Sequence, residues 1–191
     1  MTFWCVGRNY SEHAKELGNP LPTQPLIFAK SEGTLQKGQE LLIPEFVKSF
    51  HHELEIVLLL GNDLEFSHWT LGLDFTDRET QNHLKSKGEP WELCKAFKGS
   101  SALGPWQKLE SADELQSFQF QLFVNEQLRQ TGWVRDMIFP PLKLLSYLKK
   151  HFPLQAGDAV FTGTPSGVAA LKSGDRVKAQ SGELTVPWSL R

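Results

Sequence analysis

Three acidic side chains, Glu53, Glu55 and Asp74, are spaced so that together they could hold a divalent cation. Glu53 and Glu55 lead into the apolar run at residues 56–60, which is typical of a buried strand and ends at Gly61. Residues two apart on a strand point to the same side, so both carboxylates are expected on one face. Two like charges about 4 Å apart repel by roughly 4 kcal/mol at an effective dielectric of about 20. A bound cation would remove that repulsion.

Asp74 would supply the third carboxylate. It opens a polar segment of helical character that is expected to end at Gly88, with Pro90 beyond it. In such a helix Asp74, Arg78 and Gln81 share one face. Oxygen ligands suit a hard ion, so Mg²⁺ is expected, with Mn²⁺ or Ca²⁺ able to take its place. Spacing alone leaves a second interpretation equally open, in which the two glutamates lie on an exposed strand edge and Asp74 only caps a helix.

The other candidate catalytic groups are a histidine–glutamate pair and a lysine. His13 and Glu16 are three residues apart on a predicted helix over residues 9–17, hence neighbours on one helical face. A carboxylate beside an imidazole orients it and raises its basicity, as a general base requires. Taken alone, such a pair is more often found on the surface. Lys95 lies among apolar neighbours, where it either neutralises a substrate carboxylate or extends into solvent.

Several common catalytic motifs are missing from the sequence. His51 and His52 lack the spacing of a zinc site and are interpreted as neighbours that tune the acids. No G-x-S-x-G elbow, phosphate-binding loop or G-x-G-x-x-G motif occurs, which argues against a serine hydrolase, a P-loop enzyme and a nicotinamide-dependent enzyme. The glycine-containing turn at residues 162–167 is rich in hydroxyls and could hold an anion.

Composition limits the class of protein. The 191 residues, 40% hydrophobic with 13 Phe and 6 Trp, predict one globular domain. The formal net charge of −2 argues against nucleic acid as a partner. The two cysteines form no disulfide framework, and no apolar run reaches the length of a membrane span, so a cytoplasmic protein with no membrane partner is expected.

The elements that must position these groups are mostly short strands. Strands are predicted at residues 2–7, 26–29, 41–43, 53–60, 118–124 and 159–162, with two more around residues 174–175 and 181–182. Asn125 and Glu126 indicate a hairpin turn, and Pro140 and Pro141 introduce an amphipathic helix. The loop after residue 17 is punctuated by three prolines. The predicted class is α+β with β dominant.

Taken together, these segments resemble the fumarylacetoacetate hydrolase family, in particular its small single-domain acylpyruvases, which also act as oxaloacetate decarboxylases. The matching stretches follow the family's order along nearly the whole chain. They are Val6-Gly7-Arg8-Asn9-Tyr10 with His13, His51-His52-Glu53-Leu54-Glu55, Leu73-Asp74-Phe75-Thr76 with Arg78 and Gln81, Pro90-Trp91, Lys95-Ala96-Phe97, Val124-Asn125 with Arg129-Gln130, Asp136-Met137-Ile138, and Gly157-Asp158 leading to Thr162-Gly163-Thr164-Pro165.

The resemblance implies a fold and a set of roles. It implies a β-roll with few helices, a single catalytic domain over residues 1–191 and a homodimer. The metal would be held by Glu53, Glu55 and Asp74, and His13 with Glu16 would activate water. Lys95 would stabilise a developing oxyanion, and the residues expected to contact a small 2-oxo acid are Arg8, Arg78, Gln81, Lys95 and Thr164.

The activity that the resemblance implies is Mg²⁺-dependent hydrolysis of a C–C bond in acylpyruvates, with decarboxylation of oxaloacetate as a further reaction. Two alternatives stay open: an isomerase or tautomerase of hydroxymuconate-type diacids on the same metal site, and a non-catalytic dimeric member of the family. Three stretches depart from the family pattern. Residues 62–72 are shorter than expected, which bears on the placement of Asp74. Thr76-Asp77-Arg78-Glu79 and Lys30-Ser31-Glu32-Gly33 also differ, which bears on substrate preference.

Overall fold

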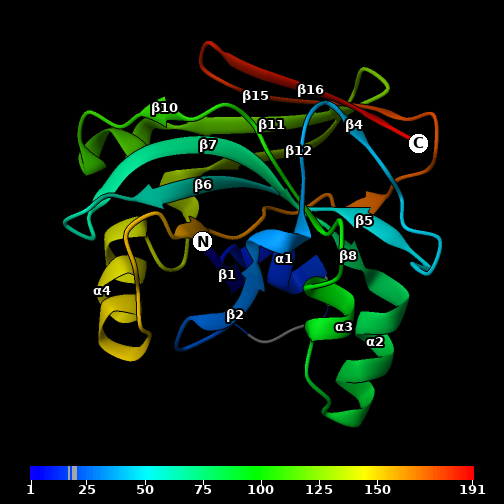
Figure 1. The fold of residues 1–191 in the computed structure, drawn as a ribbon, viewed down its shortest axis with the longest axis horizontal. Coiled ribbons are helices and arrows are strands. Elements are labelled where there is room, and N and C mark those ends of the chain that lie inside the picture. Colours follow the sequence, from blue (N-terminus) through cyan, green and yellow to red (C-terminus); the bar gives the residue numbers. More distant parts are fainter. Residues whose placement is uncertain (17, 19–20) are drawn as a thin grey trace.

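The computed structural model describes residues 1–16, 18 and 21–191, and most of its regular structure is β (Figure 1). The strands are β1 (Thr2–Gly7), β2 (Leu26–Ser31), β3 (Leu35–Gln36), β4 (Glu40–Leu41), β5 (Phe50–His52), β6 (Leu54–Leu60), β7 (Phe66–Asp74), β8 (Thr76–Asp77), β9 (Ser101–Leu103), β10 (Gln107–Lys108), β11 (Gln119–Val124), β12 (Gln127–Trp133), β13 (Ala159–Phe161), β14 (Ala169–Ala170), β15 (Arg176–Ser181) and β16 (Leu184–Leu190). The α-helices are α1 (Ser11–Glu16), α2 (Arg78–Lys87), α3 (Glu92–Lys95) and α4 (Pro141–His151), and the 3₁₀ helices are η1 (Glu32–Thr34), η2 (Ala112–Ser117) and η3 (Val134–Asp136). None of the helices in the described ranges is both long and apolar enough to cross a membrane.

Two large sheets pack face to face and enclose the main core. An eight-stranded sheet runs β2-β1-β13-β6-β7-β9-β3 with β10 paired to β7, and a five-stranded sheet runs β12-β11-β15-β16-β4. In Figure 1 the five-stranded sheet lies above β6 and β7, while α1, α2 and α3 lie below them. Ile56 and Leu58 of β6 share one buried cluster with Phe120 of β11 and Trp188 of β16. The predicted α+β class with β dominant is therefore confirmed, as is the β-roll.

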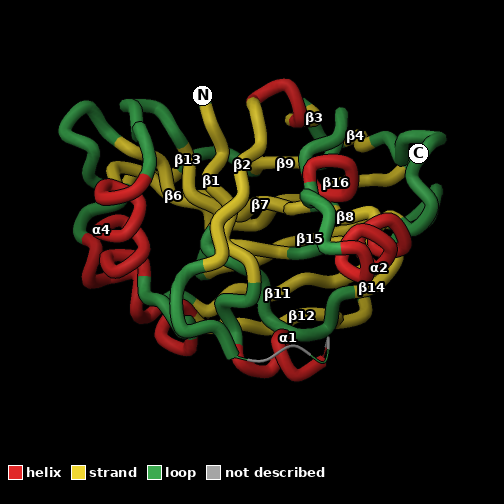
Figure 2. Tube along the Cα trace, turned by 90° about the horizontal axis from the view of Figure 1, so that it is seen from below, coloured by secondary structure: helices red, strands yellow, loops and turns green. Residues whose placement is uncertain are grey.

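Strand β6 separates this core from a second one. Because successive side chains alternate across a strand, Ile56 and Leu58 face the main core while Val57 packs with Phe3 and Phe161 on the opposite side. Glu55 shares the second side with Val57, and so belongs to the face on which the helices lie. Seen from below, α2 and α4 flank the strands on opposite sides, and α1 lies along a third edge (Figure 2).

The shortened stretch at residues 62–72 forms the tight end of a hairpin and its returning strand. β6 and β7 pair antiparallel, with Leu54 opposite Leu73, and the Gly61 N–H donates to the Glu65 carbonyl at 2.8 Å to close the turn. The Asp74 N–H donates to the Glu53 carbonyl at 2.9 Å, so the open end of the hairpin brings these two acids together. The shorter connection therefore leaves Asp74 opposite Glu53.

Several local predictions are confirmed. The strand predicted at residues 2–7 is β1, and the helix introduced by Pro140 and Pro141 is α4. Asn125 and Glu126 have φ of 51° and 62°, as the two central residues of a tight primed turn require, and join β11 to β12. The helix predicted over residues 9–17 is α1, which is shorter; residue 17 and the first proline of the following loop, residue 20, lie outside the described residues.

The prediction that Asp74 opens a helix is wrong. Asp74 is the last residue of β7, where it pairs with Ser101 of β9, and the helix begins at Arg78. Asp77 caps it, because its carboxylate accepts a hydrogen bond from the Thr80 N–H at 3.4 Å. The helix ends as predicted at Gly88, whose φ is 69°. Glu53 was also expected within a strand, but it lies between β5 and β6, where the chain passes from the three-stranded sheet β14-β5-β8 into the large one.

Candidate active site

The three predicted acids converge at the open end of the β6–β7 hairpin. Each offers a carboxylate oxygen within 4.8 Å of the others. Glu53, Glu55 and Asp74 are buried, with exposed fractions of 5%, 2% and 1%. Three buried carboxylates at this separation form an oxygen-only cluster that fits a hard divalent ion. The interpretation of Glu53 and Glu55 as an exposed strand edge is wrong, and so is that of Asp74 as a helix cap.

Three cations lie against these carboxylates. Lys95 Nζ donates to Glu53 Oε2 at 2.8 Å and to Asp74 Oδ2 at 2.6 Å, and an Arg78 N–H donates to Glu53 Oε1 at 2.5 Å. The buried Lys30 ammonium lies 2.5 Å from Asp74 Oδ1, but it donates to the Ser100 carbonyl instead. Asp74 Oδ1 therefore accepts no hydrogen bond from the described residues and is paired with Lys30 by charge alone, a place that a divalent cation could take.

Burial and charge act on the carboxylates in different ways. Burial alone would raise the pKa of Glu53, but the Lys95 and Arg78 cations outweigh it and hold the pKa well below its usual range. Among the described residues, no cation forms an ion pair with Glu55. Burial and the neighbouring Asp74 raise its pKa, although the Gly163 N–H donates to its Oε2 at 2.6 Å. The cluster thus contains one firmly ionised carboxylate and one that would gain from a nearby cation.

His13 and Glu16 form the predicted pair on α1, in which His13 is buried and Glu16 is exposed. His13 is 4% exposed, and its Nδ1 lies 3.3 Å from Glu16 Oε2. Glu16 is held in turn by the Gly167 N–H, at 3.1 Å from Oε1. Burial lowers the pKa of His13, against the opposing effects of Glu53 and Glu16. The imidazole is therefore neutral near pH 7, and Nδ1 is engaged by Glu16, which leaves Nε2 to accept a proton.

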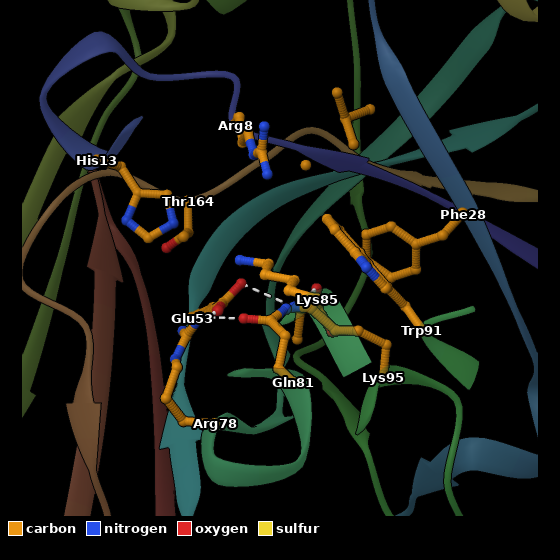
Figure 3. A pocket seen from close by; sticks show the side chains of 13 residues that line it. Arg8, His13, Phe28, Glu53, Arg78, Gln81, Lys85, Trp91, Lys95 and Thr164 are labelled. Carbon is orange, nitrogen blue, oxygen red and sulfur yellow. Dashed lines mark hydrogen bonds and ion pairs between the residues drawn. The ribbon is translucent and has the colours of Figure 1, made fainter. Parts of the chain in front are cut away.

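A small cavity of about 30 Å³ lies between α1, α2 and the acid cluster. It has room for one or two water molecules, so a larger ligand would require the side chains that line it to move apart. Figure 3 shows side chains from these elements reaching into it. The lining residues are Val6, Gly7, Arg8, His13, Phe28, Glu53, Asp74, Arg78, Gln81, Lys85, Trp91, Lys95 and Thr164. The cavity is therefore lined by all the predicted site residues except Glu16 and Glu55. Glu16 contacts His13 from the solvent side, and a carboxylate oxygen of Glu55 lies within 4.8 Å of one of Asp74.

The loop after β13, held by β6 and β12, forms the wall opposite α2. Thr164 Oγ1 donates to the Leu54 carbonyl at 2.8 Å and accepts from Gln130 Nε2 at 2.8 Å. Gly163 has φ of 100°, and a Cβ there would lie 2.6 Å from the Cβ of Asn9, so this position requires glycine. The loop after β13 thereby places Thr164 at the cavity and directs an N–H at Glu55.

From the sequence, no role at the acid cluster or the cavity was expected for four residues that the structure places there: Lys30, Lys85, Trp91 and Gln130. Lys30 reaches Asp74 from β2, and Gln130 holds Thr164 from β12; no local pattern connects either to the acids. Trp91 was matched to the family without a role. Lys85 could have been found, because it follows Arg78 by seven residues and Gln81 by four, on the same face of α2.

Comparisons with known proteins agree on one family. The family model described as "Fumarylacetoacetate (FAA) hydrolase C-terminal" matches residues 2–186. The chain is 39% identical over 185 residues to oxaloacetate tautomerase YcgM of Escherichia coli (strain K12), covering 91% of this chain and 84% of that protein. It is also 39% identical over 191 residues to the mitochondrial oxaloacetate tautomerase FAHD1 of Oryza sativa subsp. japonica, covering 91% and 82%. The crystal structure of fumarylpyruvate hydrolase from Pseudomonas aeruginosa in complex with Mn²⁺ and pyruvate is 30% identical, with a TM-score of 0.92 over 100% of this chain and 89% of that one.

Proposed function

The chain belongs to the fumarylacetoacetate hydrolase family, and we propose that it is a divalent-metal-dependent enzyme that interconverts the keto and enol forms of a small 2-oxo acid such as oxaloacetate. Residues 1–191 would act as one catalytic domain, in a homodimer. The observation that carries the proposal is a buried, neutral imidazole on the same cavity as a buried cluster of three carboxylates.

The metal would be held by Glu53, Glu55 and Asp74, with Mg²⁺ first and Mn²⁺ or Ca²⁺ in its place. Support comes from the buried oxygen of Asp74 that accepts no hydrogen bond, and from the Mn²⁺ in the related hydrolase. When bound, the ion would polarise the 2-oxo group and stabilise the negative charge that develops on it. A divalent cation would also lower the pKa of Glu55, so that all three carboxylates ionise.

His13 would move the proton. In the keto-to-enol direction, Nε2 takes a proton from the carbon next to the 2-oxo group, and the electron pair of that C–H bond forms the C=C bond of the enol. The Glu16 carboxylate stabilises the imidazolium so formed, and the proton is then delivered to the enol oxygen. Arg8, Arg78, Gln81 and Thr164 line the same cavity and would orient the acid.

The second candidate is hydrolysis of acylpyruvates, which the name of the Pseudomonas aeruginosa relative favours. Here His13 takes a proton from water, the oxygen attacks the distal carbonyl, and the C–C bond breaks to leave a carboxylic acid and the enol of pyruvate. Lys95 and Gln81 would stabilise the developing oxyanion. Decarboxylation of oxaloacetate to pyruvate and CO₂ leads to the same enol without water. An isomerase of hydroxymuconate-type diacids would use only the proton transfer.

One set of incubations separates these reactions. The protein is depleted of metal with a chelator and then supplied with Mg²⁺, Mn²⁺ or Ca²⁺, with oxaloacetate or acetylpyruvate as substrate and products followed by NMR. Accelerated keto–enol exchange without new carbon products identifies a tautomerase. Pyruvate with acetate identifies the hydrolase, and pyruvate with CO₂ the decarboxylase. Acceleration of none of these reactions would rule out the proposal and favour a non-catalytic protein.

Two variants test whether the activity depends on the acid cluster. Glu53→Gln preserves shape but removes a ligand charge, so activity with every metal should fall to background. His83→Ala changes an exposed histidine on α2 and should leave activity at the wild-type level. Activity retained by Glu53→Gln would contradict the assignment of the acid cluster as the metal site.

A further inference from the structure

The cavity is lined by more cationic side chains than form ion pairs with the acid cluster. Lys30, Arg78 and Lys95 each lie within 2.8 Å of an oxygen of the acid cluster. Arg8 and Lys85 line the same cavity, but no carboxylate of the described residues forms an ion pair with either. Two cations are therefore left facing the cavity, and a divalent metal would increase the positive excess further.

Lys85 is held at the cavity by an aromatic wall. Its ammonium lies 5.3 Å from the centroid of the Trp91 ring, and Trp91 packs against Phe28 with ring centroids 6.1 Å apart. Figure 3 shows Lys85 extending into the cavity from the side of α2. The Trp91 face attracts the cation without neutralising it, and it shields the ammonium from water. The charge of Lys85 is thus positioned and available to an anion.

Arg8 faces the same space from the end of β1. Its backbone has φ of 60°, a left-handed conformation that is costly for a side chain other than glycine, asparagine or aspartate. Its Nε is buried and has no hydrogen-bond partner among the described residues. The Arg78 guanidinium, in contrast, already donates to Glu53 and Gln81 at 2.5 Å. Arg78 Nε also lacks a hydrogen-bond partner, but its guanidinium is already paired with Glu53, so the cationic side chains that line the cavity without an ion pair to a described carboxylate are Arg8 and Lys85.

Electrostatic repulsion among these cations would be relieved by an anion. Burial, followed by the charges of Arg8 and Arg78, lowers the pKa of Lys85 from its usual value to about 8. A carboxylate placed between Arg8 and Lys85 would favour the charged ammonium and would satisfy the buried Arg8 donor.

We propose that Lys85, with Arg8 beside it, binds the second carboxylate of the substrate, and so selects dicarboxylic 2-oxo acids over monocarboxylic ones. This inference rests on the proposed function, because it assumes that the 2-oxo acid end of the substrate occupies the acid cluster. It adds a residue to the site, Lys85, and a substrate class. Arg78, Gln81 and the metal would bind the 2-oxo acid end of the substrate. Lys85 would recognise the second carboxylate at the substrate's other end.

The test compares two ligands that differ by one carboxylate. Oxaloacetate carries the second carboxylate, and pyruvate is the same molecule without it. Binding of each is measured by calorimetry in the presence of Mn²⁺ for the wild type, Lys85→Met and Lys85→Arg. Lys87→Met, an exposed lysine on the same helix, is the control for a loss of overall charge.

Loss of one charge-assisted hydrogen bond corresponds to about 10–100-fold in affinity. Lys85→Met should therefore weaken oxaloacetate binding by about that factor more than it weakens pyruvate binding, and Lys85→Arg should restore most of the difference. Lys87→Met should match the wild type with both ligands. KM for oxaloacetate should rise in the same variants, with kcat changing less.

Equal losses for both ligands in Lys85→Met would overturn the inference, because they would place the lysine at the shared 2-oxo acid end or in a structural role. Wild-type protein that binds oxaloacetate no more tightly than pyruvate would overturn it as well. Failure of the proposed function has a different signature, since a protein that binds both ligands with the expected preference but accelerates no reaction would refute only the catalytic assignment.

Discussion

Replacing Lys95 with methionine, a neutral side chain of similar length, should strongly destabilise the metal-free protein. Lys95 is 3% exposed, and its ammonium is shared by Glu53 and Asp74 at 2.8 and 2.6 Å. Removing one partner of a buried, hydrogen-bonded ion pair costs about 3–5 kcal/mol. Here the two carboxylates lose a shared ammonium and keep only Arg78 on Glu53 and Lys30 on Asp74. In a chain of this size 1 kcal/mol shifts Tm by about 2–4 °C, so Tm should fall by roughly 6–20 °C.

A divalent cation should return part of that loss. Lys95 and the metal would compete for oxygens of the same two carboxylates, so Lys95→Met should gain more Tm from Mn²⁺ than the wild type gains. Binding at 100 times Kd contributes about 2.7 kcal/mol to the free energy of unfolding. Differential scanning calorimetry at neutral pH, first with EDTA and then with Mn²⁺, measures both effects.

Lys98→Met provides the matched control, because Lys98 lies three residues later in the chain and is exposed. Its change in stability should stay within about 0.5 kcal/mol of zero. A Tm for metal-free Lys95→Met as high as that of Lys98→Met would refute the argument that this ion pair stabilises the fold. Equal gains from Mn²⁺ in Lys95→Met and wild type would refute the competition between the lysine and the cation.

Four further predictions concern single residues. His13→Ala should slow acylpyruvate hydrolysis by ~10²–10⁴-fold, the usual contribution of a positioned base, and slow oxaloacetate decarboxylation much less; equal losses in steady-state assays would show that His13 only orients substrate. As pH rises through about 8, Lys85 should lose its proton and KM for oxaloacetate should rise, and a Lys85→Arg variant should lack this change. Burial, reinforced by the charge of Arg78, lowers the pKa of His51 to about 4, below the 6.5 of an unfolded histidine. The unfolded state therefore binds more protons between these two values, and the free energy of unfolding should fall as pH drops from 6.5 towards 4. Urea titrations of His51→Asn should give a shallower pH dependence than those of the wild type. Gly163→Ala places a Cβ 2.6 Å from Asn9 in a left-handed conformation, so its Tm should fall, and a Tm equal to wild type would contradict the close approach.

The acid cluster could be anticipated from sequence because its spacing follows strand geometry. The i, i+2 pair of glutamates beside a buried strand and the glycine that closes it are local signals, and so is the Asn125–Glu126 turn. The resemblance to the family then identifies Asp74 as the third member of the acid cluster. The structure brings the three carboxylates together, although Glu53 lies between β5 and β6 and Asp74 ends a strand instead of opening a helix.

Other parts of the site could not be read from local patterns. Asp74, Arg78 and Gln81 have helical spacing, yet Asp74 belongs to β7 because the sheet satisfies its backbone, so tertiary hydrogen bonding overrides the periodicity. Lys30 reaches Asp74 only because β2 pairs with β1 at the far side of the large sheet. Burial of His13 follows from the packing of α1 against the strands. Such contacts depend on the whole topology rather than on spacing.

The tight β6–β7 hairpin also bears on the order in which the acid cluster is assembled during folding. All three acids lie at the open end of one short antiparallel pair, and contacts between neighbours in sequence form with little loss of chain entropy. Hairpins form in about 1–10 μs, whereas the contacts that bring His13 and Lys30 to the cavity join distant segments and form later. We therefore expect the three carboxylates to approach one another early in folding, before His13 and Lys30 reach the cavity.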